Sequence, residues 1–448
     1  MSRFRFRSAS LLLVSFAAVA GAQQRPPIRQ LGQVAAKSEE SFGGLVGIRA
    51  LSDGRVLVND MARRRVLLFD QGLKSFTIVA DSTEATANAY SGRVGGLMAY
   101  RGDSSVFVDP QSLSMLVIDG AGKIARVMSV PRSQDAVTLV NGAFGSPGFD
   151  KAGRLVYRAS PFVAGPRQLN VTGGAGGGFQ MPEIPDSAAI VRIDPATRHL
   201  DTLGFIKTQK IKMDITRDAD GRMTGMVSQV NPLPVVDDWA LLPDGTVAFV
   251  RGHDYHVDFV ATDGSRASSA KIPFEWQRLT DEDKIAFIDS VKAARARMGA
   301  NAPLVMGAAG AQAAAAGGGG GAGPQIVFRM EGGGPGGPGG GGGAQRNATA
   351  PPGVQVNFVP PTDLPDYKPP FFAGAVKADT EGNLWIRTIP TKAIAGGPVY
   401  DVINRKGELI DRVQIPVDRS IIAFGSSGLV YLSHRDGTTT YLERATVK

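Results

Sequence analysis

The sequence predicts an all-β fold, a six-bladed β-propeller with one helical insertion and a disordered Gly-rich loop. Two observations point to it. A meander of short apolar runs recurs six times along the 448 residues, and those runs are apolar on consecutive residues instead of alternating. The chain contains no cysteine, so disulfides cannot stabilise it and packing must do so.

The repeat is clearest between its first two copies. Residues 53–70 (DGRVLVNDMARRRVLLFD) align, 49 positions further on, with GDSSVFVDPQSLSMLVID, and Asp60 then matches Asp109. Each copy is a polar turn, an apolar run, a short turn and a second apolar run, which is the pattern of a β-meander. Four looser copies complete the set; they begin at Asp150, Pro243, Thr380 and Ser426.

A short apolar segment precedes each copy and is predicted to form the innermost strand of its blade. These segments are residues 45–50, 96–100, 146–149, 239–242, 374–378 and 421–424. Central runs such as RVLV and SVFV are apolar throughout, so both faces of each sheet must be covered. Blades stacked around a ring cover both faces, whereas a β-sandwich would not explain a repeated meander.

The two ends of the propeller are expected to meet. The last copy has only three strands before the chain ends, and residues 28–35 precede the first copy without a meander of their own. We expect residues 28–35 to supply the outer strand of the last blade and so to close the ring without a raw sheet edge.

The N-terminus has the features of a cleaved secretory signal. Three arginines precede the apolar stretch 11–20, which ends in the small residues Ala20, Gly21 and Ala22. The predicted domains are therefore a signal peptide, 1–22, and a propeller, 23–448, in the periplasm or outside the cell. No segment is long and apolar enough to span a bilayer, so no transmembrane segment is predicted. The net charge of +8 includes the three signal arginines, and the remaining +5 is too mild to imply nucleic acid.

The DGRVLVND turn and strand, followed by RRRVLLFD, resemble the NHL-type propeller repeat, most clearly over residues 47–80. Outside its low-complexity part the chain resembles secreted bacterial six-bladed β-propeller proteins, which also carry a helical insertion before the penultimate blade. The resemblance implies the fold and export. It implies little about function, because propellers host many unrelated activities.

Three inserts interrupt the repeats: residues 161–186, 205–238 and 273–370. The second shows no strand signal and is expected to be a long loop. The third opens with a helical insertion, 273–300, and continues as a low-complexity Gly-rich loop, 301–353, which lacks the side chains that would offset the entropy of ordering.

The helix predicted in the third insert starts at Thr280, an N-cap residue followed by three acidic residues. Its apolar stripe, Ile285, Ile288, Val291 and Met298, is expected to pack on the propeller. All three inserts occupy connections that emerge on one face of a propeller, here called the insert-bearing face. Insertions gathered on one face often mark the binding side of a repeat protein, and we expect the helix to cover the channel mouth there.

Charged and aromatic residues just before the inner strands are the candidate ligand contacts. They are Glu40, Arg93, Asp237, Asp238, Phe371, Asp418 and Arg419. Carboxylates and arginines around one mouth could bind a polar ligand, although each residue alone also fits a solvated loop charge. Asp60 and Arg65 are better explained as a brace across their own hairpin, and Asp109 and Asp119 as turn formers.

No metal site or cofactor is predicted, but binding of calcium or of zinc is kept as an alternative. Calcium could bind through Glu40 and Asp237. Zinc could bind at the hairpin turns assigned to His253, His256 and His434, with Asp254 or Asp436 added.

The sequence contains no nucleophile elbow, Walker loop or HExxH helix. The predicted function is therefore noncatalytic binding of a protein, peptide or glycan, with no nucleic acid partner. The alternative is an NHL-like metal-dependent lyase or hydrolase acting at the channel mouth. NHL-type lyases hold their metal with histidines around the channel, whereas the predicted inner strands contain none.

Overall fold

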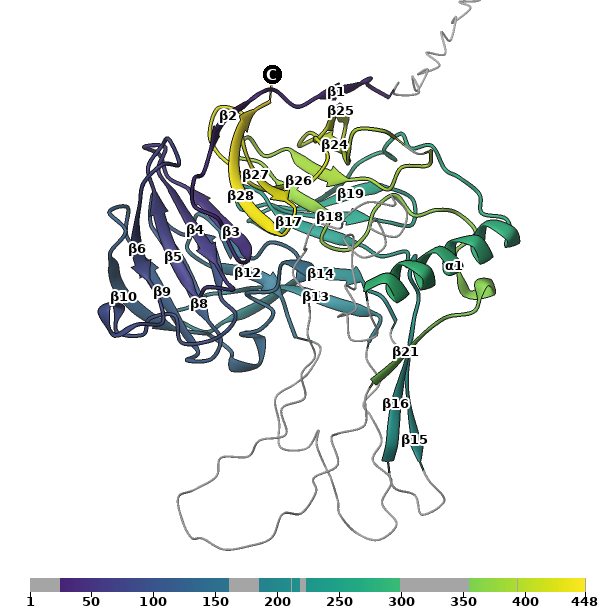
Figure 1. Ribbon diagram of the computed structural model, residues 1–448, viewed down its shortest axis with the longest axis horizontal. Helices are drawn as coiled ribbons and strands as arrows, with labels where there is room; N and C mark the ends of the chain where they lie inside the picture. Colours follow the sequence, from purple (N-terminus) through teal and green to yellow (C-terminus); the bar gives the residue numbers. More distant parts are fainter. Residues whose placement is uncertain are drawn as a thin grey trace, which may run out of the picture.

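A computed structural model describes residues 25–160, 185–210, 212–217, 223–298, 354–392 and 394–447. Six antiparallel meanders are arranged as blades of a ring, which confirms the six-bladed β-propeller (Figure 1). The predicted signal peptide, residues 161–184 of the first insert, and the Gly-rich loop 301–353 lie outside the described residues. No helix within the described residues is long and apolar enough to cross a membrane.

Each blade begins with its innermost strand, and in all six the inner strand lies where the sequence predicted it. Blade 1 comprises β3 (Leu45–Ala50), β4 (Val56–Asp60), β5 (Arg65–Phe69) and β6 (Phe76–Ala80). Blade 2 comprises β7 (Gly96–Ala99), β8 (Ser105–Asp109), β9 (Ser114–Ile118) and β10 (Ile124–Ser129). Blade 3 comprises β11 (Gly148–Phe149), β12 (Leu155–Arg158), β13 (Ser187–Ile193) and β14 (Leu200–Lys207). Blade 4 comprises β17 (Asp238–Leu241), β18 (Val247–Arg251), β19 (His256–Val260) and β20 (Arg266–Ser268). Blade 5 comprises β22 (Val376–Ala378), β23 (Leu384–Arg387), β24 (Val399–Ile403) and β25 (Leu409–Gln414). Blade 6 comprises β26 (Arg419–Phe424), β27 (Leu429–Asp436) and β28 (Thr439–Thr446). Short 3₁₀ turns occur at Glu84–Thr86, Ser133–Asp135, Gly142–Phe144 and, as η4, Pro361–Asp363.

The N-terminal segment closes the ring, as expected, but it does so at two blades. Strand β2 (Val34–Lys37) pairs antiparallel with β28 and becomes the outer strand of blade 6. Strand β1 (Ile28–Gln30) pairs parallel with β25 and adds a fifth strand to blade 5. The two strands cover the outer edges of neighbouring blades.

The core consists of buried clusters between neighbouring blades, which explains the runs of consecutive apolar residues. In β4, Val56 and Val58 pack with residues of blade 6, whereas Leu57 between them packs with residues of blade 2. Successive side chains of a strand point to opposite faces, so each face of the blade needs its own apolar set. The same arrangement recurs around the ring.

The second insert does not form the long loop that the sequence suggested. Strands β15 (Lys212–Arg217) and β16 (Met223–Val230) form a hairpin, and β21 (Val354–Phe358) pairs parallel with β16. This small sheet stands away from the blades (Figure 1). The segment KMDITR does alternate polar and apolar residues, but its basic surroundings hid the pattern, and its partner β21 lies far along the chain.

Helix α1 (Asp281–Met298) confirms the predicted helical insertion. Thr280 caps it: its Oγ1 accepts the Asp283 N–H at 3.2 Å, and the Asp283 carboxylate accepts the Thr280 N–H at 3.0 Å. Ile288 is buried against Leu364 and Ile389, so the helix is docked on the propeller.

One member of the expected helix stripe was wrong. Ile285 is 49% exposed, and Lys284 occupies the buried face in its place. The lysine stem packs there while Nζ reaches the Asp366 carboxylate at 2.8 Å. The side chain of Met298 lies outside the described part of the chain.

The predicted hairpin brace in blade 1 is present. The Asp60 carboxylate is fully buried; it accepts the N–H groups of Gly43 and Gly44 at 3.1 and 3.0 Å and the Arg65 Nε–H at 3.2 Å. Asp109 and Asp119 accept backbone N–H groups of their own turns, as turn formers do.

Candidate functional site

Three of the predicted contacts lie at the start of blades 1 and 6. The Glu40 carboxylate pairs with Arg65 at 2.5 Å and with Arg63 at 3.0 Å, joining the segment before β3 to the β4–β5 hairpin. Arg419 forms a two-pronged pair with Glu443 at 2.6 and 3.1 Å, and Asp418 is exposed beside it. Glu40 and Arg419 are therefore engaged within the protein.

Two further predicted contacts differ sharply in exposure. Arg93 precedes β7 and is exposed. Phe371 is fully buried and its ring lies 6.0 Å from that of Tyr255, in the cluster between blades 4 and 5. A fully buried ring contributes to packing.

Asp237 and Asp238 precede or begin β17, and they join blade 4 to its two neighbours. Asp237 accepts the Lys207 N–H of blade 3 at 3.0 Å and pairs with Arg251 at 2.9 Å. The buried Asp238 carboxylate accepts the Val376 N–H of blade 5 at 2.9 Å. Burial raises the pKa of Asp238 to about 6, although these backbone hydrogen bonds act in the opposite direction.

Two cations near Asp238 were missed by the sequence reasoning. Lys377 lies on inner strand β22, and Arg158 ends β12. Burial lowers the pKa of Lys377 and lowers the pKa of Arg158 to about 10, while the Asp238 charge raises both. Nothing in the local sequence signals this grouping, because the three residues come from three blades.

The structure does not bring together a set of ligands for the calcium or zinc site that the sequence left as alternatives, within the described residues. Within the described ranges no three His, Asp or Glu side chains come together to hold a metal ion. Glu40 and Asp237 belong to blades 1 and 4, on opposite sides of the six-bladed ring. His256 pairs with Asp254 at 2.6 Å, and His434 lies in strand β27, not in the expected turn, where it pairs with Glu443 at 2.7 Å.

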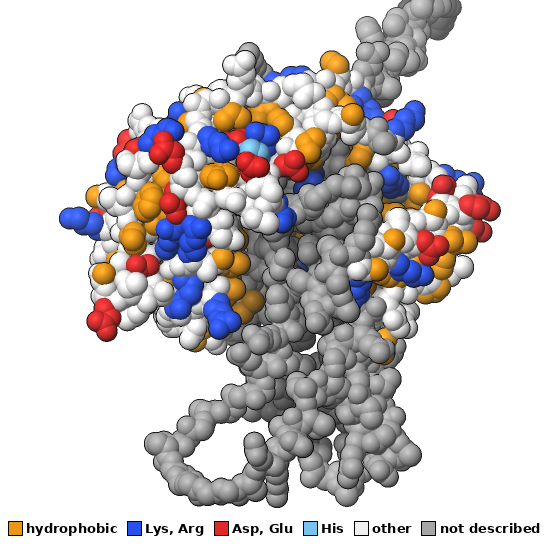
Figure 2. All heavy atoms as spheres, in the orientation of Figure 1, with side chains coloured by type: hydrophobic (Ala, Val, Ile, Leu, Met, Phe, Trp, Pro, Cys, Tyr) orange, Lys and Arg blue, Asp and Glu red, His pale blue; other side chains and the backbone are white. Residues whose placement is uncertain are grey.

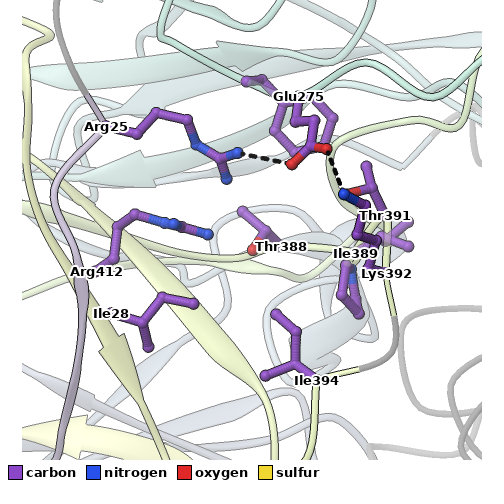
Figure 3. Close-up of a pocket in the computed structure, with 11 residues that line it drawn as sticks. Arg25, Ile28, Glu275, Thr388, Ile389, Thr391, Lys392, Ile394 and Arg412 are labelled. Carbon is purple, nitrogen blue, oxygen red and sulfur yellow. Dashed lines mark hydrogen bonds and ion pairs between the residues drawn. The ribbon is translucent and has the colours of Figure 1, made fainter.

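A pocket of about 220 Å³ lies beside blade 5, and we call it the blade-5 pocket (Figure 3). Four parts of the chain line it: residues 25–28, which lead into β1, the start of the third insert, the β23–β24 loop and strand β25. Its lining residues are Arg25, Ile28, Phe274, Glu275, Thr388, Ile389, Pro390, Thr391, Lys392, Ile394 and Arg412. The third insert and the β23–β24 loop both emerge on the insert-bearing face.

A buried network positions one arginine of this pocket. The Arg412 Nε–H donates to the Asp401 carboxylate at 3.2 Å, and the Tyr255 hydroxyl donates to the same carboxylate at 3.1 Å. Asp401 and Tyr255 are completely buried. Burial raises the pKa of Asp401, and the nearby Arg412 charge opposes that rise. The guanidinium of Arg412 extends toward the middle of the pocket (Figure 3).

The other charges of the blade-5 pocket leave it positive. The Glu275 carboxylate lies 3.5 Å from the Arg25 guanidinium and 3.6 Å from the Lys392 ammonium group. The pocket has three cations, Arg25, Lys392 and Arg412. Two carboxylates lie against them, those of Glu275 and Asp401, so the net charge is +1 when all five groups are ionised. A planar guanidinium held by a buried carboxylate suits two-pronged recognition of an acid group.

Sequence reasoning missed this pocket because no local motif marks it. Arg25 and Arg412 come from opposite ends of the chain and meet through the parallel pairing of β1 with β25. The sequence repeat marks the blades, whereas part of this pocket is formed by segments outside the repeat, namely the N-terminal segment and the third insert.

No family model matches this chain, and no curated protein matches it in sequence. Among solved structures it is similar to a regucalcin, a calcium-binding protein from Agrobacterium tumefaciens, with 11% identity, 94% of this chain and 97% of that chain covered, and a TM-score of 0.38. It is also similar to virginiamycin B lyase from Staphylococcus aureus, with 11% identity, 93% and 88% covered, and a TM-score of 0.33. A DUF4221 family member from Bacteroides vulgatus has 8% identity, 95% and 99% covered, and a TM-score of 0.46. These likenesses are too distant to carry any functional argument, and the six-bladed β-propeller rests on the strand pairing described above.

Proposed function

We propose that this protein is an exported, noncatalytic binding propeller whose ligand carries an acid group held in the blade-5 pocket. The observation that supports the proposal most is the position of Arg412, which a fully buried Asp401 and Tyr255 hold against the pocket. A carboxylate that reached the terminal amino groups of Arg412 would complete a charge-assisted hydrogen-bonded pair.

The rest of the lining fits the same ligand. Arg25 and Lys392 supply further positive charge, and the Thr391 hydroxyl supplies a hydrogen-bonding group. Ile28, Ile389 and Phe274 provide apolar surface, as is usual where a few polar groups orient a ligand.

The seven residues that the sequence predicted as ligand contacts remain proposed contacts. Arg93 and Asp418 are the exposed members of that set and the ones best placed to meet a partner. The alternative of a metal-dependent lyase or hydrolase would be favoured by stoichiometric metal in the purified protein.

Calorimetric titration with D-galacturonate, citrate and inorganic phosphate tests the acid pocket. Arg412→Gln should weaken binding of the acid that the wild type holds by ~10-fold or more, because it removes a charged donor pair. Arg25→Gln, which removes neither of the hydrogen bonds from Tyr255 and Arg412 to Asp401, should weaken it by a smaller factor, since Arg25 is partly exposed.

Arg405→Gln is the matched control. Arg405 is a blade-5 arginine outside the pocket, paired with Asp244 at 2.7 Å, and its replacement should leave affinity unchanged. If none of the three acids bound the wild type, or if Arg412→Gln bound them equally well, the proposal would be wrong.

A further inference from the structure

Two exposed aromatic side chains share one face of a short ribbon next to the blade-5 pocket. Residues 276–279 run antiparallel to 366–368: the Lys368 N–H donates to the Gln277 carbonyl at 2.9 Å, and the Leu279 N–H donates to the Asp366 carbonyl at 2.8 Å. Arg278 and Tyr367 lie directly opposite each other.

The alternation of an extended chain decides which side chains share the outer face. Trp276 is two residues from Arg278, so Trp276, Arg278 and Tyr367 lie on the same face. Trp276 is 39% exposed and Tyr367 is 49% exposed. Leu279, on the opposite face, packs against the cluster that anchors α1.

The outer face continues into the pocket through Phe274. The rings of Phe274 and Trp276 meet edge to face with centroids 5.2 Å apart, and Phe274 lines the pocket. A cationic pocket therefore adjoins an exposed aromatic surface that is held in place by backbone hydrogen bonds.

We infer that the ligand is an acidic saccharide, with one carboxylate in the blade-5 pocket and neighbouring sugar units stacked on Trp276 and Tyr367. This inference rests on the proposed function and names its ligand class. Sugar rings present faces of C–H groups that pack on aromatic rings, while their hydroxyls need donors and acceptors such as the Thr391 hydroxyl and the Glu275 carboxylate.

The surrounding charges favour a saccharide over a polyphosphate or a strongly acidic peptide. The net charge of +1 at the pocket matches a single carboxylate. On the aromatic face Arg278 lies opposite Tyr367 and can meet the carboxylate of a neighbouring sugar unit, whereas the acidic first turn of α1, Asp281, Glu282 and Asp283, follows the ribbon and would repel a chain with more densely spaced anions. Stacking alone is also typical of single-stranded nucleic acid, so the charges carry the distinction.

Calorimetry with five probes tests the ligand class: D-galacturonate, trigalacturonic acid, neutral galactotriose, a hexathymidylate and a hexaglutamate peptide. The trimer should bind ~3- to 10-fold more tightly than the monomer, because aromatic stacking adds to the acid contact. Trp276→Ala should remove that gain, and Tyr367→Ala should reduce it. Phe205→Ala, which removes another exposed aromatic ring in blade 3, is the control and should change neither affinity.

The outcomes separate this inference from the proposed function. Equal affinity for monomer and trimer, with Arg412 still required, would overturn the saccharide and keep the acid pocket. Tighter binding of galactotriose, the hexathymidylate or the hexaglutamate than of trigalacturonic acid would also overturn it. If D-galacturonate, citrate and phosphate all failed to bind, the proposed function itself would fall.

Discussion

Replacing Tyr255 with phenylalanine tests whether a buried network positions the pocket arginine. The change removes one hydroxyl, which donates to the Asp401 carboxylate at 3.1 Å from a completely buried site. A hydrogen bond to a charged group contributes about 1.5–3 kcal/mol to stability. Phenylalanine keeps the apolar contacts of the ring with Phe274 and Phe371. We therefore expect the free energy of unfolding to fall by about 2 kcal/mol.

Urea unfolding measures this loss as a lower midpoint with an unchanged slope. Tyr157→Phe is the matched control, since it removes a buried hydroxyl that donates to Asp135 at 2.7 Å between blades 2 and 3. Both variants should lose similar stability. Only Tyr255→Phe should also weaken binding of D-galacturonate, because the Asp401 carboxylate that loses the tyrosine hydroxyl is the one that holds Arg412. If Tyr255→Phe cost less than ~0.5 kcal/mol, or if both variants affected binding equally, the positioning argument would be refuted.

Three other predictions concern the inner strand, the ring closure and the helix. Because burial raises the pKa of Asp238 to about 6, the folded state binds a proton more readily than the unfolded state. The stability of the wild type relative to Asp238→Asn should therefore fall by about 3 kcal/mol as pH rises from 4 to above 6, and a pH-independent difference in urea unfolding would contradict this. Deleting residues 25–37 removes β1 and β2; hydrogen exchange should accelerate in β25 and β28 while β8 stays protected, and unchanged protection at both outer strands would count against the closure. Ile288→Asp puts a charge on the buried face of α1 and should speed exchange in that helix, whereas Ile285→Asp should not; equal effects would show that the helix is docked differently.

Local patterns made the blades predictable, because each blade is a meander of neighbouring strands. The apolar run Val56, Leu57 and Val58 required cover on both faces, and the structure supplies that cover from blades 6 and 2. The Thr280 cap and the Asp60 brace were predictable for the same reason, since their partners lie within a few residues.

Pairings between distant segments were not predictable from one sequence. The parallel partners β16 and β21 lie on either side of the helical insertion, and β1 meets β25 from the opposite end of the chain. The blade-5 pocket is built at such a place. The helix face was misjudged at Ile285 because a lysine with a long apolar stem can be buried when its ammonium group finds a carboxylate.

Residue type alone does not show which of the predicted ligand contacts are already paired within the protein. Glu40, Asp237 and Arg419 look like free charges in sequence, yet each is paired within the protein. Acidic and basic side chains are interspersed over the face seen in Figure 2. An ion pair between segments far apart in the sequence cannot be recognised from the residue type.

A crystal structure of the protein with bound D-galacturonate would test the central claim most directly. The account predicts the carboxylate in the blade-5 pocket, within hydrogen-bonding distance of the terminal amino groups of Arg412 and close to Arg25. A sugar bound instead in the central channel beside Lys377 and Arg158, with the blade-5 pocket filled only by solvent, would contradict it.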